Sequence, residues 1–214
     1  MFILSQTPSI ANQFMLEMRD ASIQKDRLRF RKNLERLGEI LAYELSKSLS
    51  FQSQVIDTPL AKTQMMVPAE HPIIISVLRA ALPFYQGFLN FFDHADSGFV
   101  GAFREETNQG DPKINLGYLA SPPLTDRIVI LTDPMLATGR SIIESINKLS
   151  NHGIPKHIHI ATGFASPEGI DFIQKNLIVP HSFWIGSLDE RLNEKFYIVP
   201  GLGDAGDLAF GPKI

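Results

Sequence analysis

Residues 133–141 carry the polar groups of this sequence that are best suited to hold a phosphate. They follow an apolar run of strand length, and a helix is expected to begin at their end. Such a loop presents backbone N–H groups and the positive helix end to a phosphate, which the hydroxyls of Thr138 and Ser141 would assist. Asp133, at the end of the strand, can accept hydrogen bonds from sugar hydroxyls. The residue types suit a sugar phosphate, although an ordinary strand-to-helix turn can share the pattern and the P-loop spacing is absent.

A second, glycine-rich segment lies near the C-terminus. Gly201, Gly203 and Gly206 have the spacing of a dinucleotide fingerprint, G-x-G-x-x-G. Only eight residues follow Gly206, too few for the helix and second strand that a dinucleotide-binding unit needs. What remains is a loop whose exposed backbone groups can approach a flat ligand closely, with a simple turn as the alternative.

Two further groups of residues invite a chemical interpretation. Arg79 directly follows the apolar run of residues 73–78, where an arginine would suit phosphate or pyrophosphate. The alternative is a surface arginine that begins a helix. His157 and His159 share one face of a predicted strand, and with no further ligand evident we expect a packed pair rather than a metal site. The sequence has neither a G-x-S-x-G elbow nor an H-E-x-x-H motif.

The elements that must position these groups are predicted from hydrophobic periodicity. Residues 11–49 are predicted to be helical, because apolar side chains recur every three or four positions. Further along, continuous apolar runs are typical of strands covered on both faces. They occupy residues 73–78, 127–131, 157–161, 182–185 and 196–199. Helix signals lie between them, so the alternation predicts an α/β fold with a parallel sheet flanked by helices.

Side chains also predict where three helices begin. Pro83 should lie in the first turn of a helix over residues 80–92. Ser141 and Glu144 have the spacing of a capping box. Ser166, followed by a proline and a glutamate, offers an N-cap for the next helix.

One segment interrupts the alternation of strands and helices. Residues 99–107 and 113–120 flank a turn-rich linker. They predict a β-hairpin arm over about residues 97–121, projecting over an active site or onto a partner subunit.

Length and composition indicate a single globular domain of residues 1–214. The absence of cysteine excludes disulfides, thiolate nucleophiles and cysteine metal sites. A formal net charge of −3 gives no attraction to nucleic acid or to an anionic membrane. Because no apolar run is long enough to span a bilayer and the start does not fit a signal peptide, we expect a cytoplasmic protein without a nucleic-acid or membrane partner.

Taken together, these segments resemble the uracil phosphoribosyltransferases, a branch of the type I phosphoribosyltransferase family. Asp133-Pro-Met-Leu-Ala-Thr-Gly, with Ser141 two positions later, resembles the family's loop for phosphoribosyl pyrophosphate (PRPP). Residues 197–211 resemble its C-terminal uracil-binding segment, and Leu78-Arg-Ala its pyrophosphate loop. The resemblance covers most of the chain, including residues 165–169 and 188–193.

The resemblance implies that uracil and PRPP react to give UMP and pyrophosphate, with Mg²⁺ carried by PRPP rather than held by a metal site of the protein. The residues it implies for PRPP binding are Arg79, Arg104, Asp133, Pro134, Met135, Leu136, Ala137, Thr138, Gly139, Arg140, Ser141 and Asp204. Those implied for uracil binding are Ile198, Gly203, Asp204 and Ala205. Arg79 and Arg104 would contact the pyrophosphate, and Asp133 the ribose hydroxyls. Arg79 and Asp133 would be the catalytic residues.

The resemblance further implies an N-terminal helical part over about residues 1–65 and a uracil-binding loop over about residues 197–211. Many members form dimers or tetramers, so a homo-oligomer is expected, with GTP as a possible effector. Two positions depart from the family pattern: Ala81 and Arg140 stand where glycine is common.

Two alternative functions fit parts of the sequence. A transferase for a purine or orotate would share the PRPP loop, but the C-terminal loop argues against it. A PRPP- or nucleotide-sensing regulator that binds RNA would need a basic face, which the net charge of −3 supports little.

Overall fold

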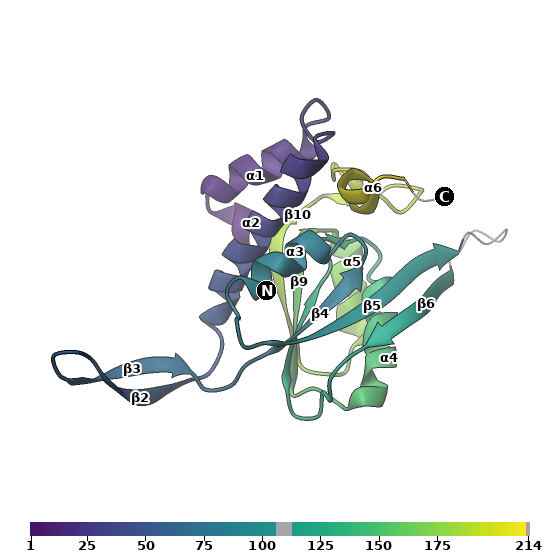
Figure 1. Ribbon diagram of the computed structural model, residues 1–214. Helices are drawn as coiled ribbons and strands as arrows, with labels where there is room; N and C mark the ends of the chain where they lie inside the picture. Colours follow the sequence, from purple (N-terminus) through teal and green to yellow (C-terminus); the bar gives the residue numbers. More distant parts are fainter. Residues whose placement is uncertain (106–112, 213–214) are drawn as a thin grey trace.

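The computed structural model describes residues 1–105 and 113–212, and Figure 1 shows most of them arranged around one central sheet. The strand order is β1-β10-β9-β7-β4-β5-β6, and β8 pairs with β9. Neighbouring strands run parallel, except that β5 and β6 are antiparallel. The strands are β1 (Phe2–Ile3), β4 (Ile73–Leu78), β5 (Asp96–Glu105), β6 (Lys113–Ala120), β7 (Ile128–Thr132), β8 (Met135–Leu136), β9 (His157–Ala165) and β10 (His181–Leu188). The predicted α/β fold with a largely parallel sheet is confirmed.

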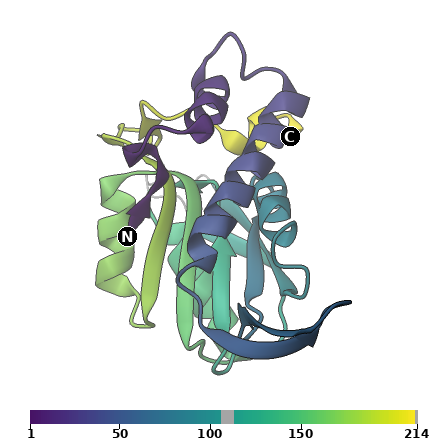
Figure 2. The same ribbon diagram turned by 90° about the vertical axis from the view of Figure 1, so that its left-hand side faces the viewer.

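Helices cover both faces of this sheet (Figures 1 and 2). The α-helices of the described part of the chain are α1 (Ile10–Arg19), α2 (Arg27–Ser46), α3 (Leu82–Leu89), α4 (Arg140–Leu149), α5 (Pro167–Asn176) and α6 (Ala205–Phe210). α2 and α3 pack with Ile74 of β4 on one face, whereas α4 and α5 pack with Ile73 and Ile75 on the other. Successive side chains of a strand point to opposite faces, so a strand covered on both must be apolar throughout.

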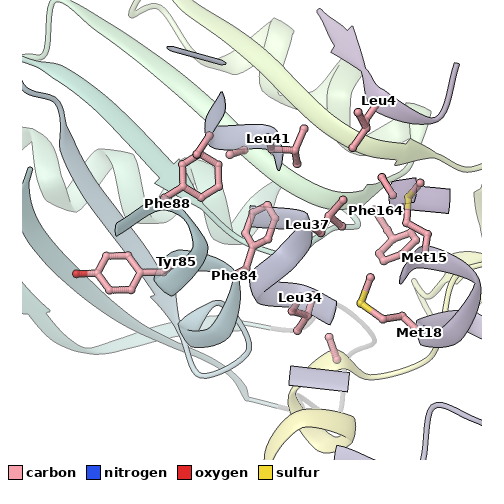
Figure 3. Packing of buried hydrophobic residues seen from close by; sticks show 14 of the residues in the cluster. Leu4, Met15, Met18, Leu34, Leu37, Leu41, Phe84, Tyr85, Phe88 and Phe164 are labelled. Carbon is pink, nitrogen blue, oxygen red and sulfur yellow. The ribbon is translucent and has the colours of Figure 1, made fainter. Parts of the chain in front are cut away.

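The core under α2 and α3 is built from large side chains and a close approach of the two helices. Figure 3 shows the side chains that meet there, among them Leu34, Leu37, Leu41, Phe84 and Phe88. The helices touch at two glycines: a Cβ at Gly38 would lie 2.2 Å from the Phe84 carbonyl oxygen, and one at Gly87 would lie 2.1 Å from the Glu35 carbonyl oxygen. Only residues without a side chain permit this spacing.

The N-terminal helical segment is divided, contrary to the prediction of one helical stretch over residues 11–49. α1 ends at Arg19 and α2 begins after Asp26, whose side chain accepts a hydrogen bond from Arg29 N. Between them, the Asp20 carboxylate accepts hydrogen bonds from the backbone N–H and the hydroxyl of Ser22. This local turn competes with helical hydrogen bonding, which is the physical reason for the break.

A two-stranded antiparallel ribbon, β2 (Phe51–Asp57) and β3 (Lys62–Pro68), replaces the end of the predicted helical part. The expected helical region to about residue 65 is therefore wrong from residue 51 onward. The ribbon projects from the body of the molecule (Figure 1), and nearly all its residues are exposed. With no buried face, these strands lack the alternating pattern by which a strand is recognised.

The predicted hairpin arm is present as β5 and β6, but β5 also belongs to the central sheet. Residues 96–101 of β5 pair with β4, and only beyond Gly101 does β5 pair with β6 alone. The register shifts between Gly101 and Ala102. The arm is thus a continuation of the sheet past the end of β4.

Two other predictions need correction. Residues 196–199 do not join the central sheet: β12 (Ile198–Val199) pairs antiparallel with β11 (Arg191–Leu192) in a small separate sheet. The helix predicted over residues 80–92 is the shorter α3, with Pro83 in its first turn as expected. The N-cap role of Ser166 is confirmed, because its side chain accepts a hydrogen bond from Gly169 N. No helix within residues 1–105 and 113–212 is long and apolar enough to cross a membrane.

His157 and His159 form the packed pair that was predicted, with ring centroids 4.6 Å apart. Trp184 Nε1 donates to His159 Nδ1 at 3.1 Å, so this nitrogen acts as an acceptor. Ser182 Oγ lies 2.8 Å from the same nitrogen. Burial, with a smaller contribution from His157, lowers the pKa of His159 from 6.5 to about 4. His159 is therefore neutral at neutral pH.

This histidine should make stability depend on pH. The unfolded chain binds its proton near pH 6.5 and the folded protein only near pH 4, so unfolding takes up a proton as the pH falls. We expect His159 to lower the free energy of unfolding by about 2 kcal/mol between pH 7 and pH 5. Urea unfolding of wild type and His159→Gln at both pH values would measure this, with the exposed His152→Gln as control. The same pH dependence in wild type and His159→Gln would contradict it.

Candidate active site

A cavity of about 740 Å³ opens where β4 and β7 end. Its wall is formed by the residues after β4, the loop between β7 and α4, the C-terminal loop and part of β6. The carboxyl edge of an open α/β sheet is the usual place for a ligand. The cavity therefore lies where the sequence analysis expected a site.

The cavity brings together most of the predicted site residues. Those that line it are Arg79, Asp133, Met135, Ala137, Ser141, Ile198, Gly203, Asp204 and Ala205. Pro134, Leu136 and Gly139 are buried, and with the partly buried Thr138 and Arg140 they lie outside the wall. The backbone of Arg104 pairs with Ile114 between β5 and β6, but its side chain lies outside the described residues.

The loop after β7 is held on β9 by backbone hydrogen bonds. Asp133 N donates to Ala161 O at 3.1 Å, and the Asp133 carboxylate accepts from Met135 N at 3.1 Å. The next residues form β8, which pairs with Phe164 and Ala165 of β9. The side chain of Asp133 is therefore presented to the cavity from a backbone that is fixed on both sides.

Gly139 shapes the entry into α4. Its φ of +74° favours glycine, and a Cβ there would lie only 2.8 Å from the Gly169 carbonyl oxygen. Gly139, the N-cap residue, has no side chain to cap α4, and the Thr138 hydroxyl accepts a hydrogen bond from Arg140 N at 3.4 Å. The first N–H groups of a helix need partners from outside the helix, and an anion can supply them. Ser141, in the first turn, lines the cavity beside these groups.

The predicted capping box of Ser141 and Glu144 is wrong. α4 begins at Arg140, with Gly139 as its N-cap, so Ser141 is already inside the helix. A capping side chain must belong to the residue that precedes the helix. Only from there can it accept hydrogen bonds from the backbone N–H groups of the first turn. Glycine at the N-cap contributes no capping side chain of its own.

The two departures from the family pattern are compatible with the local backbone. Ala81 has a φ of −72° and is fully buried, so a side chain is accommodated there. Arg140 is the first residue of α4, and the positive φ falls on Gly139 before it. Neither position needs the conformational freedom of glycine.

The C-terminal loop presents its backbone to the cavity. Gly203 has a φ of +96°, and no described atom lies within 4 Å of the position that its Cβ would take. Asp204 caps α6, its carboxylate accepting from Asp207 N at 2.9 Å. The backbone groups around Gly203 are thus accessible from the cavity, while the residues after them are fixed by α6.

Arg79, in the cavity wall, connects the segment after β4 with the C-terminal segment. Its side chain is exposed, and Nη2 lies 3.2 Å from the Gly211 carbonyl oxygen and 3.5 Å from the Asp207 carboxylate. An exposed guanidinium next to the loop after β4 can bind a phosphate group bidentately.

Some residues that line the cavity were not named individually as site residues from the sequence. Tyr118 of β6, 56% exposed, and its neighbour Gly117 contribute one part of the wall, and Phe196 and Tyr197 another. The predicted position of the hairpin arm over an active site was the only signal for Tyr118. Phe196 belonged to a run that was interpreted as an ordinary strand, whereas Tyr197 was the first residue of the predicted uracil-binding loop and was assigned no individual contact.

A side chain of α5 supports the small β11–β12 sheet that carries Ile198. The Glu168 carboxylate accepts a hydrogen bond from Leu192 N at 2.9 Å, which is the main cause that lowers the pKa of Glu168. This contact joins the segments of residues 165–169 and 188–193, whose resemblance to family segments was noted from sequence.

The loop of residues 133–141, which has the features of a phosphate-binding loop, and the glycine-rich C-terminal loop face one cavity. Together they define an α/β protein suited to binding a sugar phosphate and a flat ligand side by side. The chain belongs to the uracil phosphoribosyltransferase family, whose model matches residues 4–212. A uracil phosphoribosyltransferase of Porphyromonas gingivalis is 46% identical over 206 residues, covering 96% of this chain and 95% of that protein. One of Thermococcus gammatolerans is 39% identical over 205 residues, covering 94% and 89%. The solved AQ2163 protein from Aquifex aeolicus has a TM-score of 0.85 at 30% identity, with 98% of each chain covered.

Replacing Asp133 by asparagine should reduce kcat/KM by at least about 100-fold, because a charged acceptor is lost from the cavity wall. The fold should be unaffected, since an asparagine oxygen can still accept from Met135 N. Steady-state kinetics and thermal unfolding would test both statements. Asp126→Asn, at the opposite end of β7, makes the same chemical change outside the cavity and should behave as wild type. Unaltered kinetics in Asp133→Asn would remove this residue from the site.

Proposed function

We propose that this protein transfers the phosphoribosyl group of PRPP to uracil, forming UMP and pyrophosphate in pyrimidine salvage. The observation that carries the proposal is the shared cavity, which has the loop of residues 133–141 on one side and the loop of residues 198–206 on the other. The names of the similar proteins from Porphyromonas gingivalis and Thermococcus gammatolerans support the choice of uracil.

The residues of the cavity suit this reaction electrostatically. Displacement of pyrophosphate from the anomeric carbon builds positive charge on the sugar and negative charge on the departing group. Arg79 would stabilise the pyrophosphate, aided by Arg104, and Asp133 would hold the ribose hydroxyls. The N-terminus of α4, with Thr138 and Ser141, would hold the 5-phosphate. Positioning and charge, rather than covalent chemistry, are what the protein contributes.

Base recognition would rely on backbone groups of the C-terminal loop. Uracil presents an acceptor, a donor and an acceptor along one edge, and the backbone around Ile198 and residues 203–205 faces the cavity. Cytosine would place its amino donor where uracil has an acceptor. A fixed backbone donor would then have no partner, so cytosine should be strongly disfavoured.

The residues also fit a Mg²⁺ ion that arrives with PRPP. Asp133 and Asp204 both line the cavity, and proteins usually bind Mg²⁺ through one or two carboxylates together with substrate phosphates. When bound, the ion would neutralise charge on the pyrophosphate.

A panel of bases tests the proposed reaction. The protein would be mixed with PRPP, Mg²⁺ and, separately, uracil, cytosine, orotate, adenine or hypoxanthine, and nucleotide and pyrophosphate measured. We expect UMP with uracil, and cytosine to be disfavoured by about 10⁴-fold in kcat/KM. Turnover with another base would overturn the specificity, and PRPP binding without any turnover would overturn the enzyme assignment. Adding GTP to the uracil reaction tests whether this nucleotide is an effector.

We also propose that the enzyme is a cytoplasmic homo-oligomer in which the β2–β3 ribbon packs on a second copy. The ribbon and the turn that connects its strands expose several large apolar side chains: Phe51, Val55, Leu60, Met65 and Met66. A two-stranded hairpin is only marginally stable alone in water. Covering these side chains with another copy would stabilise the ribbon and remove apolar surface from solvent.

Sedimentation velocity at several protein concentrations tests this assembly. Wild type should sediment as a dimer or tetramer of the 23.9 kDa chain, whereas Met66→Lys should shift the protein towards monomer. Ile178→Lys, which places the same charge at a 98% exposed residue away from the ribbon, should leave the assembly unchanged. A monomeric wild type, or Met66→Lys and Ile178→Lys with the same sedimentation, would contradict the proposed interface.

A further inference from the structure

Arg19 and Asp189, which lie near opposite ends of the chain, form an ion pair that hydrogen-bonds to both the N–H and the carbonyl of Gly201. Arg19, the last residue of α1, donates from both terminal nitrogens to Asp189, with Nη1 at 2.8 Å from Oδ2. The same Nη1 donates to the Gly201 carbonyl oxygen at 2.9 Å, and Gly201 N donates to Asp189 Oδ2 at 2.8 Å. The N–H and the carbonyl of one residue are therefore both fixed by charged partners.

The next residue of the loop is held by Gln24, in the turn between α1 and α2. Gln24 Nε2 donates to the Leu202 carbonyl oxygen at 3.1 Å. The same nitrogen lies 2.9 Å from Met18 O and 3.2 Å from Arg19 O, so the amide is itself fixed at the end of α1. Figures 1 and 2 both place the C-terminal segment beside these N-terminal helices.

The ion pair is anchored in the core. The Asp189 side chain is only 3% exposed, and Asp189 N donates to Ala165 O, which ties it to the end of β9. The Arg19 guanidinium lies over the fully buried Phe164 ring, 4.4 Å from its centroid. Ser187, near the end of β10, accepts a hydrogen bond from Arg19 Nη2. Arg19 and Asp189 thus form a rigid clamp rather than a mobile surface contact.

The position of this clamp in the chain gives it a role. Gly203 directly follows Gly201 and Leu202, and both glycines have positive φ, at +58° and +96°. A loop with two glycines in three residues has a wide choice of backbone conformations unless something holds it. If the loop became ordered only when the ligand binds, the conformational entropy lost in ordering it would weaken binding.

We infer that Arg19, Asp189 and Gln24 are positioning residues for base recognition: they hold Gly201 and Leu202 so that residues 203–205 present a fixed set of backbone groups to the base. The inference rests on the proposed function of that loop in binding uracil. None of the three residues lines the cavity, so they act through the loop and not on the substrate.

Two conservative variants test the clamp. Arg19→Lys keeps the charge but loses the two-pronged geometry of the guanidinium, and Gln24→Leu keeps the shape but loses the donor to Leu202. Each should raise the KM for uracil by about tenfold and narrow the preference for uracil over cytosine, as expected for loss of one positioning hydrogen bond. The Kd for PRPP alone, from calorimetry, should change less than the KM for uracil, because most residues assigned to PRPP lie in the loop of residues 133–141, which is held separately on β9, and only Asp204 belongs to the C-terminal loop.

The controls separate a positioning role from a merely structural one. Arg29→Lys alters another arginine of the N-terminal helices. Arg29 pairs with Glu17 at 3.3 Å and does not contact the loop, so this variant should leave the KM for uracil and the Kd for PRPP unchanged. Arg19→Met and Asp189→Asn each leave an unpaired charge and should lower the melting temperature as well as uracil affinity. Unchanged uracil KM in Arg19→Lys and Gln24→Leu, or equal losses for uracil and PRPP, would overturn the inference.

A third variant, Gly203→Ala, distinguishes failure of the clamp inference from failure of the proposed function. Alanine at a φ of +96° disturbs the loop backbone itself, while its Cβ meets no described atom within 4 Å. A raised uracil KM in Gly203→Ala, with Arg19→Lys and Gln24→Leu at wild-type values, would leave the base site in place and reject the clamp. Wild-type uracil KM in all three variants would reject residues 203–205 as the base site, and the inference with it. Wild type without uracil turnover would reject the proposed function.

Discussion

The common direction of β4 and β7 is the constraint on which the site depends. These strands are adjacent and parallel, so the residues that follow them, Arg79 and Asp133, emerge at the same edge of the sheet. Helices cover both faces with apolar side chains, which leaves that edge as the place where polar groups can meet a ligand. The direction of these two strands therefore determines where the polar groups of the cavity meet.

The two walls of the cavity are made rigid by different means. The loop after β7 is fixed locally, by pairing of β8 with β9 and by Gly139 at the start of α4. The C-terminal loop has no sheet of comparable size behind it. Its backbone is held instead by side chains from the opposite end of the chain and from the end of β10. One wall thus depends on backbone pairing and the other on charged and amide side chains.

The predictability of each element followed from how it is buried. β4 and β7 are covered on both faces, which requires the continuous apolar runs that identified them. The β2–β3 ribbon has no buried face, so its residues show no period and it was missed. The break at Asp20 depends on one local hydrogen-bonded turn, which periodicity over a long window does not detect.

The site shows a similar division between local and distant contacts. Residues such as Asp133, Ser141 and Gly203 lie in short motifs, so resemblance to a family could group them, and the fold places all three in the wall of one cavity. Tyr118 lies in no such motif. The pairing of Arg19 with Asp189 joins residues 170 positions apart, and neither spacing nor residue type connects them. Contacts of that kind become visible only when the fold has placed the two ends of the chain together.

The hydrogen bonds from Arg19 and Gln24 to the C-terminal loop have a consequence for attempts to exchange specificity between proteins of this fold. A loop for another base, grafted here alone, would arrive without the donors that shape its backbone. The residues that would have to be transferred together are discontinuous in sequence. They comprise the end of α1 with the turn after it, the residues after β10, and the loop itself. A chimera that respects this unit has to carry pieces from both termini.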